Sequence, residues 1–159
     1  MTRLIVRRSI VGFGVALVGA SFFAAAGCSK DPNDPKTWIN QLGQPPLREQ
    51  AISELQKVYE RRLNKQGGNR AAPEIAGLND QIVPAVVSAY NGARDDHPNR
   101  ARMITMLDLT RDRRALPVFI DALDFTPDLN EDNAKRGAEA LGHLGAAEAV
   151  EPLLATLER

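Results

Sequence analysis

The chain has 159 residues, with 20 basic and 20 acidic residues and a single cysteine. Three of the basic residues lie in residues 1–27, which contain no acid, so the rest of the chain holds 17 basic against 20 acidic residues, a net charge of about −3. A mildly acidic body with 5% aromatic residues argues against a nucleic-acid partner, which requires a basic face. One cysteine excludes an internal disulfide.

Residues 1–28 have the order of a secretory signal. A basic segment, 1–8, precedes the uncharged residues 9–27, which end in small side chains just before Cys28. Basic residues stay on the cytoplasmic side while the apolar stretch enters the bilayer. The stretch is also long enough for the alternative, an uncleaved membrane-spanning helix. Arg7-Arg8 resembles the core of a twin-arginine export signal, with an ordinary secretory signal as the other interpretation.

The end of this stretch, Ala25-Ala26-Gly27-Cys28, resembles the lipobox of bacterial lipoproteins, although that family most often has leucine where this chain has Ala25. The resemblance implies a lipid on the Cys28 sulfur and cleavage between Gly27 and Cys28, which makes residues 1–27 a signal peptide. Several acyl chains anchor a protein stably, because each buried methylene contributes about 0.8 kcal/mol. In lipoproteins of bacteria with two membranes the residue after the cysteine helps sorting, so the resemblance implies, from Ser29 in place of aspartate, the periplasmic face of the outer membrane.

The pattern of the body predicts helices and no strands. A polar tether spans 28–34, and its turn-forming residues offer no core that could bury a thiol. Asp34-Pro35 and Pro45-Pro46 are typical helix starts, so we expect a helix hairpin over 35–64. Residues 65–79 contain two adjacent glycines and no apolar period, which predicts a loop.

Residues 80–159 contain an internal repeat. The apolar positions of 115–123 match those of 149–157 at a constant offset of 34, and those of 83–90 match 116–123 at an offset of 33. A fixed period of this length, built from helix pairs, predicts a helical solenoid in which each pair buries its apolar face against its neighbours. The predicted fold class is therefore all-α.

Two segments carry a family resemblance. Residues 138–145 followed by 149–154 resemble a bacterial HEAT repeat of the short type found in bilin-lyase-like proteins, and residues 114–123 resemble the first helix of another. The resemblance implies a right-handed α-solenoid of antiparallel helix hairpins over 80–159. Residues 148–159 resemble a first helix without its partner, so we expect an incomplete last repeat, a helix covered on one side only, and either a fragment or a capping partner.

No residue set predicts an active site. His97 lies in a polar turn, His143 occupies a position that usually faces solvent, and the acids of 121–132 lack the central glycine of a calcium loop. We expect those acids, Asp128 among them, to cap the helix that starts near Asn133. We therefore expect no catalytic residue, no metal, no cofactor and no small-molecule substrate.

The resemblance implies instead a binding face, because in HEAT-like stacks the second helix of each pair lines the concave side. The polar candidates on that face are Arg48, Glu49, Ser53, Gln56, Arg100, Arg102, Thr105, Lys135, Arg136, Glu139 and His143. The expected function is that of an envelope lipoprotein that presents a scaffold to a protein partner. The alternatives are a tetrapyrrole lyase or isomerase, an activity known among relatives of this repeat type, and a structural spacer of a longer chain.

Overall fold

The computed structural model describes residues 31–124, 126 and 129–157. The predictions for the signal peptide, for Gly27 and for the lipid on Cys28 lie outside the described residues. Within the described residues the chain is all-helical, as predicted, and no helix there is long and apolar enough to cross a membrane. The helices are α1 (Pro35–Ile39), α2 (Pro45–Lys65), α3 (Pro73–Asn91), α4 (His97–Thr110), η1 (Arg113–Ala115), α5 (Leu116–Ala122), α6 (Glu131–Leu144), η2 (Ala147–Ala149) and α7 (Val150–Leu157).

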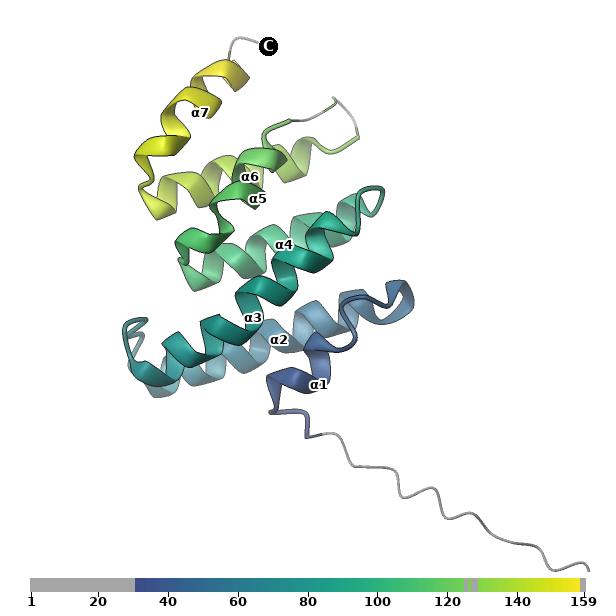
Figure 1. Ribbon diagram of the computed structural model, residues 1–159, viewed down its shortest axis with the longest axis vertical. Helices are drawn as coiled ribbons and strands as arrows, with labels where there is room; N and C mark the ends of the chain where they lie inside the picture. The colour runs from purple at the N-terminus through teal and green to yellow at the C-terminus, as the bar shows by residue number, and fades with distance from the viewer. Residues whose placement is uncertain (1–30, 125, 127–128, 158–159) are drawn as a thin grey trace, which may run out of the picture.

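The helices form two layers (Figure 1). α2, α4 and α6 follow one another in what we call the second-helix layer, where α4 contacts both α2 and α6. α1, α3 and α5 cross this layer on one side, and each successive pair (α1 with α2, α3 with α4, α5 with α6) is in contact. α7 lies at the end of the stack opposite α1.

Proline and a side-chain cap set the first helix starts. The Asp34 carboxylate accepts a hydrogen bond from the backbone N–H of Lys36 at 3.0 Å, and Pro35 takes the first helical position. Pro45 opens α2 in the same way after an extended residue. Proline suits this position because the N–H that it lacks would have no partner inside the helix. The predicted hairpin over 35–64 is confirmed, and its first helix is short.

The loop predicted over 65–79 is wrong in its second half, because α3 begins at Pro73. Ile75 and Leu78 are buried and extend the apolar stripe of α3 toward its N-terminus. Since proline at the first helical position starts a helix rather than breaking it, Pro73 marks the end of the loop.

The repeat offset of 34 is confirmed in the bounds of the elements. It relates the start of α4 at His97 to that of α6 at Glu131, the start of η1 at Arg113 to that of η2 at Ala147, and the start of α5 at Leu116 to that of α7 at Val150. The residues that follow α4 and α6 both have left-handed backbone, with φ of 56° at Arg111 and 62° at Gly145. We call residues 97–123 the first unit and residues 131–157 the second unit.

A continuous core lies between the layers and reaches from Leu42 to Ala149. The two layers approach closely where α6 crosses α5. A Cβ added to Gly137 would lie 2.8 Å from the Cβ of Ala122 and 2.9 Å from the carbonyl oxygen of Phe119. This crossing therefore requires glycine, because such distances are shorter than van der Waals contact.

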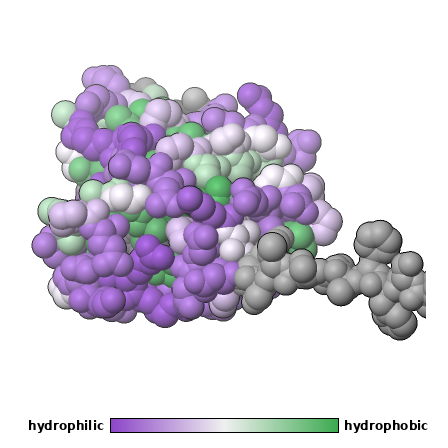
Figure 2. Space-filling view, turned by 60° about the horizontal axis from the view of Figure 1, so that its bottom comes forward, coloured by the Kyte–Doolittle hydropathy of each residue, from purple (hydrophilic) through white to green (hydrophobic). Residues whose placement is uncertain are grey.

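The two ends of the stack differ in their surfaces. Figure 2 turns the end near α1 and α2 toward the viewer, and hydrophilic residues cover most of that face. At the other end α7 buries no residue, and Val150, Leu154 and Leu157 are 53%, 51% and 84% exposed. The prediction that the last helix is covered on one side only is confirmed.

Candidate functional site

A groove of about 440 Å³ lies between α2, α4 and α6 of the second-helix layer. Five of the residues predicted for the binding face line it, at least one from each helix. They are Ser53, Gln56, Arg102, Thr105 and Arg136. Ile52, which is 1% exposed, and Ala101 form an apolar floor beneath these polar walls. An apolar floor with a few polar groups is typical of a binding groove.

Arg102 and Arg136 occupy equivalent positions in the two units, related by the repeat offset. Arg102 Nη2 donates to Glu49 Oε1 at 2.8 Å, which joins α4 to α2. Arg136 Nη1 donates to Thr105 Oγ1 at 3.0 Å, which joins α6 to α4, and its Nε donates to Asp132 Oδ2 at 2.8 Å.

Both arginines keep a large exposed area, with side chains 45% exposed for Arg102 and 41% for Arg136. Exposed ion pairs of this kind contribute about 0–1 kcal/mol each. Either guanidinium can therefore exchange its present carboxylate for a carboxylate of another molecule with little loss of free energy. We call Glu49, Ser53, Gln56, Arg102, Thr105 and Arg136 the groove residues.

The polar face continues beyond the groove along the boundary between α4 and α6. His143 Nδ1 lies 3.1 Å from both carboxylate oxygens of Asp108, and the His143 side chain is 51% exposed. The predicted solvent-facing position of His143 is therefore confirmed. Glu139 is exposed one helical turn earlier, so it shares this face of α6.

Arg48 does not belong to the face, although the sequence pattern placed it there. It is 7% exposed, its Nε donates to the carbonyl oxygen of Leu42 at 2.9 Å, and its Nη1 donates to Asp96 Oδ2 at 2.7 Å. Arg48 precedes Ile52 by one helical turn, so it shares the buried stripe of α2. Burial raises the pKa of Asp96, but hydrogen bonds from Asn99 and Arg48 outweigh it and hold that pKa below its usual value.

Lys135 also lies elsewhere. It lines an apolar groove between α6 and α7, away from the groove between α2, α4 and α6. Lys135 and Arg136 are neighbours in the sequence, and successive residues of a helix point about 100° apart because a turn contains about 3.6 residues. Lys135 and Arg136 therefore lie on different surfaces of α6.

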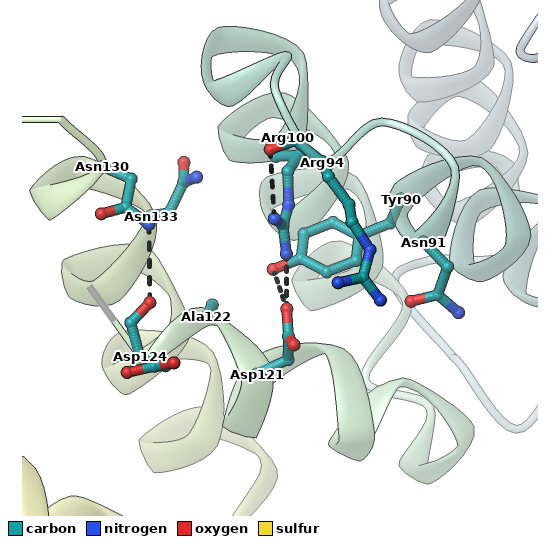
Figure 3. Close-up of a pocket in the computed structure, with 9 residues that line it drawn as sticks. All are labelled: Tyr90, Asn91, Arg94, Arg100, Asp121, Ala122, Asp124, Asn130 and Asn133. Atoms are coloured by element: carbon teal, nitrogen blue, oxygen red, sulfur yellow. Dashed lines mark hydrogen bonds and ion pairs between the residues drawn. The ribbon is translucent and has the colours of Figure 1, made fainter. Parts of the chain in front are cut away.

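Arg100 is the third misplaced residue, and it lies in a polar pocket of about 220 Å³ (Figure 3). Its guanidinium carbon is 4.0 Å from the centroid of the Tyr90 ring, and its Nη2 donates to Asp121 Oδ2. The Tyr90 hydroxyl donates to the same oxygen at 3.0 Å. These three side chains come from α4, α3 and α5, so together they join three helices, and we call them the clamp.

The clamp sets the electrostatics of this pocket. Burial raises the pKa of Tyr90 to about 12; the charge of Arg100 opposes this rise and that of Asp121 adds to it. The phenol therefore remains a hydrogen-bond donor at neutral pH. Two donors converge on one Asp121 oxygen, which suits a structural contact better than acid–base chemistry. No sequence signal indicated the pocket, because its residues lie on four helices (α3, α4, α5 and α6) and on the loops before α4 and before α6.

Of the acids predicted to cap α6, Glu131 and Asp132 lie in its first turn instead of before it. α6 begins at Glu131 after Asn130, which makes no cap hydrogen bond. Asn130 Oδ1 instead accepts from the backbone N–H of Thr126 at 2.7 Å, and Asp132 pairs with Arg136 in the first turn. Asp128 lies outside the described residues. Within those residues, no group of three His, Cys, Asp or Glu side chains could hold a metal ion.

The family model described as PBS lyase HEAT-like repeat matches residues 135–159. The match begins within α6 and includes η2 and α7, so it covers most of the second unit. HEAT-like helical repeats are therefore supported over this segment, and the shared repeat offset relates the first unit to it. The chain matches no curated protein and no solved structure at a significant level.

Proposed function

We propose that this protein is an envelope lipoprotein whose HEAT-like repeats form a right-handed α-solenoid and serve as a non-enzymatic scaffold for a protein partner. The observation that carries the proposal is the placement of Arg102 and Arg136 at equivalent repeat positions over one groove. The HEAT-like match and the two helix layers support the solenoid. The sequence of residues 1–28 supports the anchor.

The groove favours a partner segment that carries acidic side chains. Arg102 on α4 and Arg136 on α6 place two guanidinium groups on neighbouring helices that line one groove. Guanidinium binds carboxylates in a bidentate geometry, which gives orientation as well as affinity. Carboxylates of the partner would take the places of Glu49 and Asp132, while its apolar atoms contact Pro98, which is exposed in the groove.

The lipid anchor would hold the groove close to the membrane surface. Residues 28–34 separate Cys28 from the first helix. Residues 31–34 form a turn, in which the backbone N–H of Asp34 donates to the carbonyl oxygen of Asp31 at 3.1 Å and Trp38 Nε1 donates to that of Pro32 at 2.9 Å. Only residues 28–30 could therefore extend, and at no more than about 3.6 Å per residue they reach about 11 Å. The proposal therefore places α1 near the periplasmic face of the outer membrane and the groove within reach of proteins close to that surface.

Charge reversal in the groove tests the scaffold. The full chain is cross-linked in intact envelopes and purified, with wild type compared to Arg102→Glu combined with Arg136→Glu. The matched control is Arg61→Glu combined with Arg113→Glu, which changes the net charge equally at exposed arginines away from the groove. We expect wild type and control to recover the same partner and the groove variant to recover about tenfold less.

Two results would overturn the scaffold proposal. One is reproducible recovery of no partner by wild type. The other is equal recovery by the groove variant and the control, which would place the contact elsewhere. A structural spacer, the alternative from the sequence, would give the second result because it needs no contact in the groove.

Cys28→Ala tests the anchor separately. We expect the variant to incorporate no labelled palmitate and to accumulate as an unprocessed precursor, because the thiol is the acceptor of the lipid. Palmitate labelling that survives the substitution would contradict the lipoprotein assignment. An uncleaved membrane helix would give an unlabelled chain of unchanged size in wild type and variant alike.

The lyase alternative is tested by pigment binding. The family whose model matches residues 135–159 is described as a PBS lyase HEAT-like repeat, and the match covers one repeat. A lyase or isomerase acting on tetrapyrroles would have to bind its substrate. Bilin added to the purified chain should leave the pigment's absorption spectrum unchanged if the scaffold proposal is right, and a saturable spectral shift would favour the enzyme.

A further inference from the structure

A basic surface lies at the C-terminal end of α2. Residues 57–65, the last part of this helix, contain four bases and one acid. The acid, Glu60, accepts a hydrogen bond from Gln56 Nε2 at 3.0 Å, so it turns toward the groove between α2, α4 and α6 that Gln56 lines. We call the four bases the basic patch: Lys57, Arg61, Arg62 and Lys65.

Three members of the basic patch line a second groove, of about 370 Å³. Its charged lining consists of Arg61, Arg62, Lys65 and Glu74. Arg61 Nη2 donates to Asn33 Oδ1, and Arg62 Nη2 donates to the carbonyl oxygen of Asn33, both at 3.1 Å. Neither arginine has a carboxylate partner among the described residues, and neither has Lys65. Because neutral oxygens accept weaker hydrogen bonds than charged ones, both guanidinium groups can turn to an anion at little cost.

The acids beside the patch already have partners. Glu54 Oε1 accepts from Lys57 Nζ at 2.8 Å, and Glu74 Oε2 accepts from Gln66 Nε2 at 2.7 Å. The four bases of the patch against these two acids leave an excess of two positive charges. The excess lies in the groove that Arg61, Arg62 and Lys65 line.

The adjoining turn reduces this excess without removing it. Asp31 and Asp34 each accept a backbone N–H, at 2.8 and 3.0 Å, and the exposed Lys36 follows them on α1. With these three residues the count is five bases against four acids. The acids of the turn bind the local backbone, whereas the arginines of the patch bind only neutral oxygens.

The patch lies beside the segment that leads to Cys28. Asn33, which both arginines contact, belongs to the turn over 31–34. Residues 28–30 complete the link to Cys28 and reach at most about 11 Å. The potential of an anionic membrane decays over a Debye length, about 8 Å at physiological ionic strength, so a link of this length holds the patch within a comparable range. The same link applies if residues 9–27 remain as an uncleaved membrane helix.

We propose that the basic patch binds the anionic phospholipid headgroups of the membrane to which the chain is anchored. Arg61 and Arg62 exchange the oxygens of Asn33 for phosphate oxygens, which guanidinium binds in a bidentate geometry, and Lys57 and Lys65 add two further charges. The headgroups hold the end of the stack with α1 and α2 against the bilayer and leave α7 at the far end (Figure 1). The inference rests on the anchor of the proposed function for its location and is independent of the scaffold role. The anchor retains the chain at the membrane, and the patch sets its orientation.

Lysine footprinting of the full chain in vesicles tests this orientation. The acylated chain is reconstituted with vesicles of phosphatidylcholine, alone or mixed with phosphatidylglycerol, and treated with a membrane-impermeant amine reagent before mass spectrometry. We expect Lys65 to react about fivefold more slowly on the anionic vesicles, the effect of one base near such a surface. Lys135, exposed on α6, is the internal control and should react equally on both.

Salt and charge reversal test the electrostatic origin of the protection. At 1 M salt the Debye length falls to about 3 Å, so the protection of Lys65 should disappear. Arg61→Glu combined with Arg62→Glu should also abolish it. The matched control, Arg102→Glu combined with Arg136→Glu, changes the net charge equally in the groove between α2, α4 and α6 and should keep the protection. The comparisons of lipid and salt use wild type, and a thermal melt at an unchanged midpoint shows that each variant is folded.

Flotation of the vesicles distinguishes this inference from the anchor. A chain that floats with both kinds of vesicle while Lys65 reacts equally on both would overturn the patch and support the anchor. Flotation with anionic vesicles alone would contradict the anchor and support the patch, and flotation with neither kind would contradict both. Protection of Lys65 that survives reversal of both patch arginines, or equal protection of Lys135, would also overturn the patch, because the shielding would then have another cause.

Discussion

The first and second units have the same local plan and different surroundings. Their helices begin at positions related by one repeat offset, yet Leu123 is buried and Leu157 is exposed. The difference arises because α6 covers α5, while no described helix covers α7 in the same way. Burial of the apolar side chains of such a repeat unit therefore depends on the neighbouring helix as well as on the sequence of the unit.

The units also differ in their polar contacts. Arg100 and Asp121 of the first unit belong to the clamp with Tyr90. The equivalent positions of the second unit hold Ala134 and Ala155. The charged clamp is therefore a feature of the inner unit, where α3, α4 and α5 meet, and the outer unit has alanine in its place.

Truncation of the two equivalent leucines should give the largest difference in unfolding free energy between the units. Leu123→Ala should lower the free energy of unfolding by about 2–5 kcal/mol, because it leaves a cavity in the core. Leu157→Ala should change it by less than about 0.5 kcal/mol in dilute protein, because the side chain already faces solvent. Urea unfolding followed by circular dichroism measures both.

Equal losses for these two variants would contradict the difference in burial between the units.

The crossing of α5 and α6 gives the next largest effect. Gly137→Ala should destabilise the protein by about 1–3 kcal/mol, because the new methyl group would collide with Ala122 and with the backbone of Phe119. The control is Gly142→Ala on the same helix, where an added Cβ meets nothing within 4 Å. The control should gain about 0.5–1 kcal/mol from its higher helix propensity. Thermal unfolding should therefore move the two midpoints in opposite directions.

Tyr90→Phe should show that the clamp contributes a pH-dependent part of the unfolding free energy of the protein. At pH 7 the loss of the hydrogen bond to Asp121 should cost about 1 kcal/mol. The folded pKa of Tyr90, about 12, lies above its unfolded value of 10, so the contribution of the protonated phenol is complete below pH 10 and is lost as the pH rises from 10 to 12. The difference in unfolding free energy between wild type and variant should therefore narrow above pH 10.

Urea titrations at pH 8, 10 and 11 measure that difference. A gap that stays constant across this range would show that the ionisation of Tyr90 is not linked to folding.

The caps after α4 and α6 give the smallest effect. Both Arg111 and Gly145 have left-handed backbone, which costs an L residue about 1–2 kcal/mol. Gly145→Ala should therefore destabilise the protein by about 1 kcal/mol. Arg111→Gly should change stability by less than about 0.5 kcal/mol, because relief of that strain is offset by greater chain entropy and by loss of the partly buried pair with Asp108. A clear loss for Arg111→Gly in urea unfolding would mean that the pair with Asp108 matters more than the backbone.

Much of the fold could be predicted from local signals. Asp34-Pro35 and Pro45 indicated the starts of α1 and α2, and the offset of 34 indicated the correspondence between the units. The start of α3 at Pro73 was not predicted, because the two adjacent glycines before it led us to extend the loop through residue 79. Each of these features depends on residues close together in the sequence or on the repeat itself.

The binding face was predicted less well. Five candidates meet in the groove because helical spacing and the repeat place them on one face. Arg48 was misassigned because its partner, Asp96, belongs to the loop before α4, far along the chain. Arg100 was misassigned because its partners are on α3 and α5, and the apolar spacing of α4 does not predict contacts with those helices.

The sequence by itself determined where most helices begin, the repeat offset and the all-helical class, because proline positions, caps and apolar spacing act locally. Only the tertiary structure decided which polar residues share the groove and which form the clamp, because those contacts join different helices. It also decided that one of two equivalent leucines is buried and the other exposed, since burial depends on whether a neighbouring helix lies over the side chain.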